Sequence, residues 1–244
     1  MAEMKGTLRW KFDVSAFRLI GRDLITDRIT ALFELIKNCY DANASEVVIN
    51  FKNAGTETSN QNGVIEIRDN GIGMSFIDVR DKWMVIGTSS KRRNPVSPNP
   101  FKRRCVGEKG IGRFAVDKLG DYVTIHTKQV DALSWLNVTI DWNKYFRASQ
   151  DIANIKLFTD IDNGYEFVAA ETKTETGTTL TIKGLHDIWE KKDIMRLLHE
   201  ASRIVSPYIQ QDYPFRVHVI AEEFGVDSWA DEFKVDASEI ATLS

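Results

Sequence analysis

The sequence predicts an α+β fold in which one layer of helices covers one face of a mixed, mostly antiparallel sheet. Three observations predict it. Helical periodicity is strongest early in the chain, strand-like segments dominate the later part, and the first two strand-like segments are spaced as in a hairpin. With 244 residues and 43% hydrophobic content, the chain can bury a substantial core, as one large domain or two small ones.

The first predicted helix spans residues 22–43, because apolar residues recur there at helical spacing, at positions 25, 29, 32, 36 and 39. Residues 45–51 and 64–69 are typical of strands, and the polar loop between them predicts a hairpin. A short helix is expected over residues 76–86.

Residues 87–112 have no apolar period and are rich in Gly, Pro, Ser and cations, which is typical of a functional lid or an insertion. A helix is predicted over 113–120, with Gly120 as its stop. The remaining predicted elements are strands over 122–128, 135–142, 178–185 and 215–221, and a helix over 187–205.

Composition narrows the class of protein. The net charge of −3 gives no global reason to expect nucleic acid or an anionic membrane as partner. Cys39 and Cys105 form neither a disulfide framework nor a metal-ligand spacing, which suits a reducing, cytoplasmic setting. No apolar run is long enough to span a bilayer, and the first residues lack the apolar core of a signal peptide.

The stretch "ELIKNCYDA" (34–42) places three polar side chains on one side of the first helix. At about 100° per residue, Asn38 falls about 40° from Glu34 and Asp41 about 20° from it in the other direction, opposite the apolar stripe. The pattern fits a solvated face. It also fits a ligand site, because an Asn oxygen can bind Mg²⁺ and a carboxylate one turn away can take a proton from water.

Three further motifs follow in order. "DNGIGM" (69–74) ends a strand with two glycines, which permits a turn or a close approach of ligand to backbone. "GEKGIGRFA" (107–115) runs glycines into a helix start, which forms either a hinge or an anion site, and it lacks the Walker A ending. "TGTTLTI" (176–182) opens a strand with Gly-Thr.

Taken together and in this order, the motifs resemble the GHKL ATPase superfamily. It includes gyrase-type topoisomerases, ninety-kilodalton heat-shock chaperones, MutL and MORC proteins, and histidine kinases. The resemblance covers about residues 15–220 and is strongest to the chaperone, MutL and MORC-like prokaryotic ATPases. It implies the Bergerat fold, a two-layer α/β sandwich with a long ATP lid.

The resemblance also implies a division of the chain. The ATP-binding domain would span residues 21–222, with its lid at about 75–112. Residues 1–20 would be an N-terminal extension, and residues 223–244 a tail or the start of a linker to a following domain.

By position in the motifs, Glu34 corresponds to the general base that polarises the attacking water, and Asn38 to the Mg²⁺ ligand. Asp69 corresponds to the carboxylate that binds the adenine amino group, with Thr178 near the base. The other implied nucleotide-contacting positions are Asp41, Gly71, Gly73, Met74, Gly107, Gly110, Ile111 and Gly112, with Lys91 and Lys109 as candidate phosphate contacts.

What the resemblance implies for function is Mg²⁺-dependent binding of ATP and its slow hydrolysis to ADP and phosphate. This would gate lid closure and dimerisation of the full-length protein, in a chaperone-like or DNA-transaction role. An ATP-gated clamp with negligible turnover and a histidine-kinase catalytic domain are the alternatives. Glu34, four residues before Asn38, favours the hydrolases, and the first histidine is His126, so no phospho-acceptor helix precedes the motifs.

Six cations lie between residues 91 and 104, in "KRRNPVSPNPFKRR". They suit contact with nucleic acid, whose phosphates attract clustered Lys and Arg. The alternative is a solvated or phosphate-facing lid.

Overall fold

The computed structural model describes residues 11–16, 25–86, 96–97, 99–106, 114–151, 154, 156–204 and 215–232. Its centre is one mixed sheet of eight strands, ordered β5-β4-β3-β6-β2-β1-β7-β8. The strands are β1 (Glu46–Lys52), β2 (Val64–Asp69), β3 (Gly120–Lys128), β4 (Ser134–Asp141), β5 (Gly164–Ala169), β6 (Gly177–Leu185), β7 (Arg216–Ala221) and β8 (Val226–Trp229). Only the pair β1 and β7 is parallel; the other neighbouring strands of this sheet run antiparallel.

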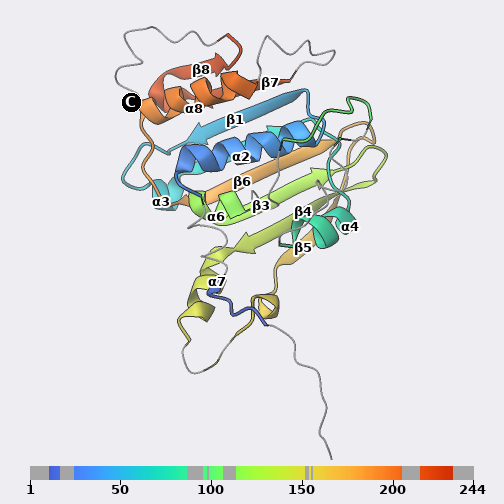
Figure 1. Ribbon diagram of the computed structural model, residues 1–244, viewed down its shortest axis with the longest axis vertical. Coiled ribbons are helices and arrows are strands. Elements are labelled where there is room, and N and C mark those ends of the chain that lie inside the picture. The colour runs from blue at the N-terminus through green and yellow to red at the C-terminus, as the bar shows by residue number, and fades with distance from the viewer. Residues whose placement is uncertain are drawn as a thin grey trace, which may run out of the picture.

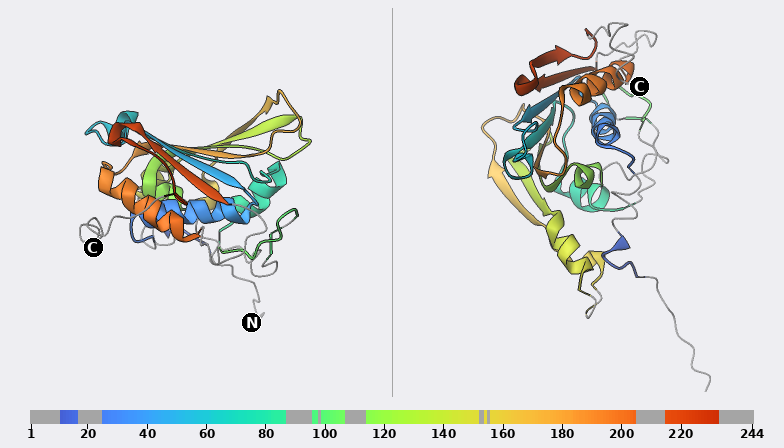
Figure 2. Two further views of the ribbon diagram at one scale, coloured as in Figure 1. Left: turned by 90° about the horizontal axis from the view of Figure 1, so that it is seen from above. Right: turned by 90° about the vertical axis from the view of Figure 1, so that its left-hand side faces the viewer.

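Helices cover one face of this sheet. The α-helices of the described residues are α2 (Arg28–Asp41), α3 (Ser59–Asn62), α4 (Phe76–Asp78), α6 (Ala115–Leu119), α7 (Trp142–Ser149) and α8 (Lys191–Ile204). Figure 1 shows α2 lying along the sheet, and Figure 2 shows α2, α6 and α8 on the same face. The predicted fold class, an α+β sandwich with one helical layer on a mixed sheet, is confirmed.

The hairpin of β1 and β2 follows from alternating side chains. Val47, Ile49 and Phe51 are buried on β1, and their neighbours in sequence are more exposed. In register, Ile49 pairs with Ile67 and Phe51 with Ile65, so the apolar side chains of both strands face the helices.

Helix α2 begins six residues later than the apolar pattern predicts. Asp27 caps it, because its carboxylate accepts the backbone N–H groups of Ile29 and Thr30 at 2.8 and 2.9 Å, and residues 25–27 are not helical. Residues 22–24 lie outside the described part of the chain. The underside of α2 is fully apolar, with Leu32 and Ile36 both 0% exposed.

Besides the short α3, which lies in the expected polar loop, three α-helices or strands were not predicted, and one was predicted with the wrong geometry. Strand β5 forms the edge of the sheet with all six residues exposed, so it has no buried alternation to detect. Helix α7 is short and buries mainly Trp142 and Tyr145. The expected helix over 76–86 is α4 followed by a π-helix, Val79–Trp83.

The third element, β8, extends the sheet beyond residue 222, where the sequence places the end of the domain. It pairs antiparallel with β7, with His218 opposite Trp229. The rings of these two residues stack at 4.3 Å between centroids. The segment after residue 222 therefore belongs to the sheet at least as far as Trp229.

Replacing Ile36 with Ala should lower the free energy of unfolding by about 2–5 kcal/mol, because it opens a cavity between α2 and the sheet. Urea denaturation measures this. Ile77→Ala is the matched control, since Ile77 is 59% exposed and its truncation should change stability by at most about 0.5 kcal/mol. Equal losses in both variants would contradict the packing described for α2.

Candidate functional site

Helix α2 carries Glu34, Asn38 and Asp41 within one unbroken run from Arg28 to Asp41. Glu34 and Asn38 are half-buried, and Asp41 is only 9% exposed. These side chains are therefore not an ordinary solvated face. A polar group that is withdrawn from water needs partners, and the partners found here define the site.

Glu34 contacts the ammonium group of Lys37, one turn further along the helix. Lys37 also lies over the ring of Phe33, with its Nζ 5.6 Å from the ring centroid. No role for Lys37 was predicted from the sequence. The i,i+3 spacing of opposite charges on a helix was the signal that could have identified it.

Asp41 reaches away from α2 toward the lid. Its Oδ1 accepts the backbone N–H of Val106 at 2.8 Å. A pocket-side position for Asp41, expected from the sequence, stays a prediction. The contact with Val106 joins Asp41 to the end of a chain segment that is 65 residues away in sequence.

Asp69 ends β2 on the helix-covered face of the sheet, and it is 9% exposed. Its Oδ1 accepts the backbone N–H of Gly71 at 2.8 Å. Across the sheet, Asp69 pairs with Thr178 of β6, and Thr178 pairs with Thr127 of β3. The hydroxyls of the two threonines are 2.9 Å apart. Asp69 and Thr178, which lie far apart in sequence, are thus direct neighbours.

Burial raises the pKa of Asp69 to about 6. The backbone N–H of Gly71 and the thiol of Cys39 act in the opposite direction, because both stabilise the ionised carboxylate. Cys39 lies on α2 and is itself buried, which raises the pKa of its thiol well above the usual value. Asp69 is therefore mostly ionised at neutral pH inside a desolvated corner between α2 and β2.

The glycines of "DNGIGM" are needed by the protein backbone itself. A Cβ on Gly71 would lie 2.5 Å from the carbonyl oxygen of Ala42. A Cβ on Gly73, whose φ is +64°, would lie 1.9 Å from the carbonyl oxygen of Lys128. The sequence leaves a turn and the approach of a ligand as reasons for these glycines, and the structure adds a packing reason that holds without a ligand.

The loop after β2 is held from two sides. The backbone N–H of Ile72 donates to Ala42 O at 2.9 Å, and that of Met74 donates to the Thr127 hydroxyl at 2.9 Å. Met74 packs partly buried against the core. The structure therefore brings together Asp69, Gly71, Gly73, Met74 and Thr178 at the ends of β2, β3 and β6. The predicted positions Lys91, Gly107, Lys109, Gly110, Ile111 and Gly112 lie outside the described residues.

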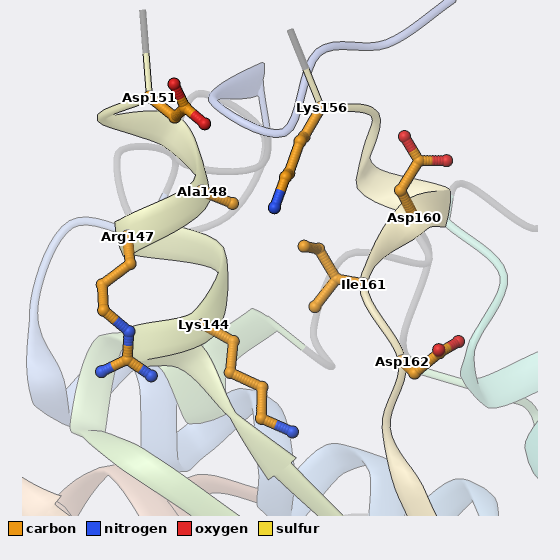
Figure 3. A pocket seen from close by; sticks show the side chains of 8 residues that line it. All are labelled: Lys144, Arg147, Ala148, Asp151, Lys156, Asp160, Ile161 and Asp162. Carbon is orange, nitrogen blue, oxygen red and sulfur yellow. The ribbon is translucent and has the colours of Figure 1, made fainter. Parts of the chain in front are cut away.

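A separate cavity of about 410 Å³ lies between α7 and residues 156–162. Its charged lining residues are three cations, Lys144, Arg147 and Lys156, and three carboxylates, Asp151, Asp160 and Asp162. Figure 3 shows Ile161 among them and Lys156 pointing into the space. The mixed signs favour no one class of ligand, and none of the predicted site residues lines this cavity. None of the helices in the described ranges is long and apolar enough to cross a membrane.

Asp69→Asn should stabilise the protein at neutral pH. The folded pKa of about 6 exceeds the unfolded value of 3.8, so the folded state binds more protons between these values and stability falls as pH rises through them. The free-energy cost of ionising the buried Asp69 carboxylate approaches its full value as the pH rises above about 6, and it amounts to at most about 3 kcal/mol. The melting temperature of the variant should exceed that of wild type at pH about 7 and approach it at pH about 4.

Asp162→Asn, at an exposed aspartate, is the control for the loss of a negative charge and should show no such pH-dependent gain. If Asp69→Asn melts below wild type by the same margin at both pH values, ionisation of the buried carboxylate does not destabilise the folded protein.

Comparison with known proteins matches the geometry. The family model described as "Histidine kinase-, DNA gyrase B-, and HSP90-like ATPase" aligns with residues 26–176. This span begins just before the Asp27 cap of α2 and ends at the residue before β6. It contains Glu34, Asn38 and Asp69.

Two curated relatives match shorter stretches. The "Putative type II restriction enzyme HgiDII" of Herpetosiphon aurantiacus is 28% identical over 116 residues, which is 48% of this chain and 17% of that protein. The "DNA mismatch repair protein PMS1" of Saccharomyces cerevisiae is 40% identical over 62 residues, which is 25% of this chain and 6% of that protein. The aligned part thus spans less than a fifth of either relative. Since the family model covers well over half of the sequence, the chain belongs to the histidine kinase-, DNA gyrase B- and HSP90-like ATPases, the GHKL superfamily.

Proposed function

We propose that this domain binds ATP with Mg²⁺ and hydrolyses it slowly to ADP and phosphate. The observation that carries the proposal is the pairing of a buried, mostly ionised Asp69 with Thr178 at the strand ends, beside a helix that bears Glu34 and Asn38. Membership of the ATPase family supports the same reaction.

Asp69 would select the base. An ionised carboxylate only accepts hydrogen bonds, so it suits the exocyclic amino group of adenine and repels the carbonyl oxygen that guanine carries at that position. Its geometry is fixed before a ligand arrives, because the Gly71 N–H already holds Oδ1 at 2.8 Å. The Thr178 hydroxyl lies beside it as a second polar contact.

Asn38 would hold the metal. Mg²⁺ prefers oxygen ligands and is usually bound through one or two side chains together with substrate phosphates, and a half-buried amide oxygen on α2 fits that role. When bound, the ion offsets the charge of the triphosphate. The predicted phosphate contacts, Lys91, Lys109 and the glycines of residues 107–112, remain part of the proposal.

Glu34 would act as the general base, taking a proton from the water that attacks the γ-phosphate. Its side chain is 31% exposed, so water can reach it. The contact with Lys37 keeps the carboxylate oriented along the polar face of α2. Binding of ATP would in turn gate closure of the lid and dimerisation of the full-length protein.

Glu34→Ala should keep ATP binding and lower the turnover rate by about 10²–10⁴-fold, because it removes the proton acceptor. Asp69→Asn should instead lose ATP binding. Steady-state phosphate release and equilibrium titration with ATP separate the two effects. Glu200→Ala is the matched control, because Glu200 also forms an i,i+3 ion pair on a helix, with Arg203 on α8.

Two outcomes would change the proposal. If both site variants hydrolyse ATP at the wild-type rate, the roles proposed for Glu34 and Asp69 are wrong. ATP-dependent dimerisation of wild type without phosphate release would favour the clamp with negligible turnover.

A second role, contact with nucleic acid, rests on the exposed cations of the lid. Lys102 and Arg104 point outward, whereas Arg103 between them is only 8% exposed and cannot contribute to a basic surface. One relative is named as a DNA mismatch repair protein and another as a restriction enzyme, which motivates the proposal.

Replacing Lys102 and Arg104 together with Ala should weaken the binding of double-stranded DNA at low salt and reduce its salt dependence, because each phosphate contact releases counterions. Fluorescence anisotropy at several salt concentrations measures both quantities. Lys191→Ala with Lys192→Ala, at the start of α8, is the control for the loss of two cations. Failure of wild type to bind DNA at low salt would remove this role.

A further inference from the structure

Arg103 is a buried cation in a segment that looks, in sequence, like a basic surface loop. The side chain lies in a box of aromatic rings, 4.7 Å from the ring centroid of Tyr40, 4.4 Å from that of Phe101 and 5.6 Å from that of Phe215. Its Nη1 donates to the carbonyl oxygen of Ala44 at 2.6 Å. Cation–π contacts of this kind are worth about 0.5–2 kcal/mol each, and more when water is excluded.

These partners come from three separate parts of the chain. Tyr40 belongs to the last turn of α2, Ala44 to the turn before β1, and Phe215 directly precedes β7. Arg103 therefore fastens its own segment to the C-terminal end of α2. We call residues 96–97 and 99–106 the anchor segment.

The anchor segment makes further contacts with the same end of α2. The hydroxyl of Ser97 donates to the Oδ1 of Asn43 at 2.5 Å, and Nδ2 of Asn43 donates to Asn99 O at 3.2 Å. Asn43 has a φ of +60°, so it occupies the left-handed position that commonly ends a helix. At the end of the segment, the Val106 N–H donates to Asp41.

The segment is also tied to itself. The backbone N–H of Arg103 donates to the Ser97 hydroxyl at 2.8 Å, and the N–H of Ser97 donates to Arg103 O at 2.7 Å. These two hydrogen bonds join Ser97 to Arg103. The anchor segment is therefore one small unit, and it packs on residues 40–44.

The electrostatics favour this docking. The last turn of α2 contains no basic residue of its own, and it carries the acidic Asp41 at the end of the helix where carbonyl dipoles are also negative. Arg103 supplies a cation at this end from elsewhere in the chain. Arginine suits the position because its charge persists on burial and its planar group stacks on rings.

The same turn of α2 holds the proposed metal ligand. The backbone carbonyl of Asn38 accepts the N–H of Ala42 at 2.9 Å, so Asn38 is part of the turn that the anchor segment covers. On the other side, Ala42 O accepts the N–H of Ile72 in the loop that follows Asp69. The adenine side of the site shares this one contact with the end of α2, and it is also held by the pairing of Asp69 with Thr178 and by the Gly71 N–H, which the anchor segment does not touch.

We propose that Arg103 is a positioning residue that acts through the last turn of α2 to fix the side chains of Asn38 and Asp41 for a metal-bound triphosphate. This inference rests on the proposed function and deepens it. It predicts that loosening the anchor segment weakens the recognition of Mg²⁺-triphosphate and leaves the recognition of adenosine unchanged.

The test is equilibrium binding of three probes, adenosine, ATP without Mg²⁺ and ATP with Mg²⁺, to wild type and to Arg103→Met. Met keeps an unbranched stem among the rings and removes the charge. The gain in ATP affinity on adding Mg²⁺ should fall by about 10-fold, the lower end of the loss seen when groups that support metal ligands are removed. Adenosine affinity should stay within about twofold of wild type.

Arg104→Met is the matched control, because Arg104 is the exposed neighbour of the same type, and it should keep the full Mg²⁺-dependent gain. Asn43→Gly is a milder variant that tolerates the positive φ and removes the side-chain contacts with Ser97 and Asn99. Asn43→Gly should also reduce the Mg²⁺-dependent gain in ATP affinity. If Arg103→Met does not fold, Asn43→Gly alone tests the proposal.

A purely structural role for Arg103 would lower the affinities for adenosine and ATP together, and that result would overturn the inference. So would an unchanged Mg²⁺-dependent gain in the variants. If wild type binds no ATP, the proposed function itself is wrong. If wild type binds ATP and Asp69→Asn abolishes that binding, the proposed function stands, and an unchanged Mg²⁺-dependent gain in the Arg103 variant contradicts only the role of Arg103.

Discussion

A carboxylate buried at the end of β2 is the constraint on which the arrangement of the site depends. Asp69 is 9% exposed, and burial raises its pKa to about 6. A fold that keeps such a group ionised at neutral pH must bring donors to it. The nearest is the N–H of Gly71, and it can approach only because residue 71 has no side chain to strike Ala42 O. The Asp-x-Gly pattern is therefore one physical unit, in which the glycine enables the hydrogen bond that the carboxylate needs.

Helix α2 connects this unit to the rest of the site. Its underside is packed into the core through Leu32 and Ile36, so the helix has little freedom to shift over the sheet. Cys39 on the same helix stabilises the Asp69 carboxylate, and Ala42 at its end receives Ile72 from the loop beyond Asp69. The two ends of a bound nucleotide would thus meet groups whose relative position is set by one rigid helix, which is the preorganisation that phosphoryl transfer depends on.

The sequence predicted those parts of the fold and site that rest on local patterns. Local patterns of apolar residues or turn residues were enough to predict three of these parts. They are the helix with Glu34 and Asn38, the hairpin of β1 and β2, and the strand that begins next to Thr178. The motif order also supplied the neighbourhood of Asp69 and Thr178, which local pattern alone does not give.

What escaped prediction depends on contacts between distant segments. Strand β5 is an edge strand with every residue exposed, so its conformation follows from pairing with β4 and not from its own alternation. The start of α2 was placed too early because Ile25 continues the apolar period, although the helix begins only after the Asp27 cap. The contact of Asp41 with the Val106 N–H was not predicted because Val106 is 65 residues away in sequence.

Lys102, Arg103 and Arg104 show how far a charge pattern can mislead. In sequence the three cations are equivalent, and together they suggest a basic surface. In the structure the outer two are exposed, and the middle one is buried among three rings and a backbone carbonyl. A run of cations therefore has two separable physical roles, one in the interior and one at the surface. Neutralising all three at once would mix the loss of an anchor on α2 with the loss of surface charge, so the effect of either role can be assigned only when Arg103 is varied apart from its neighbours.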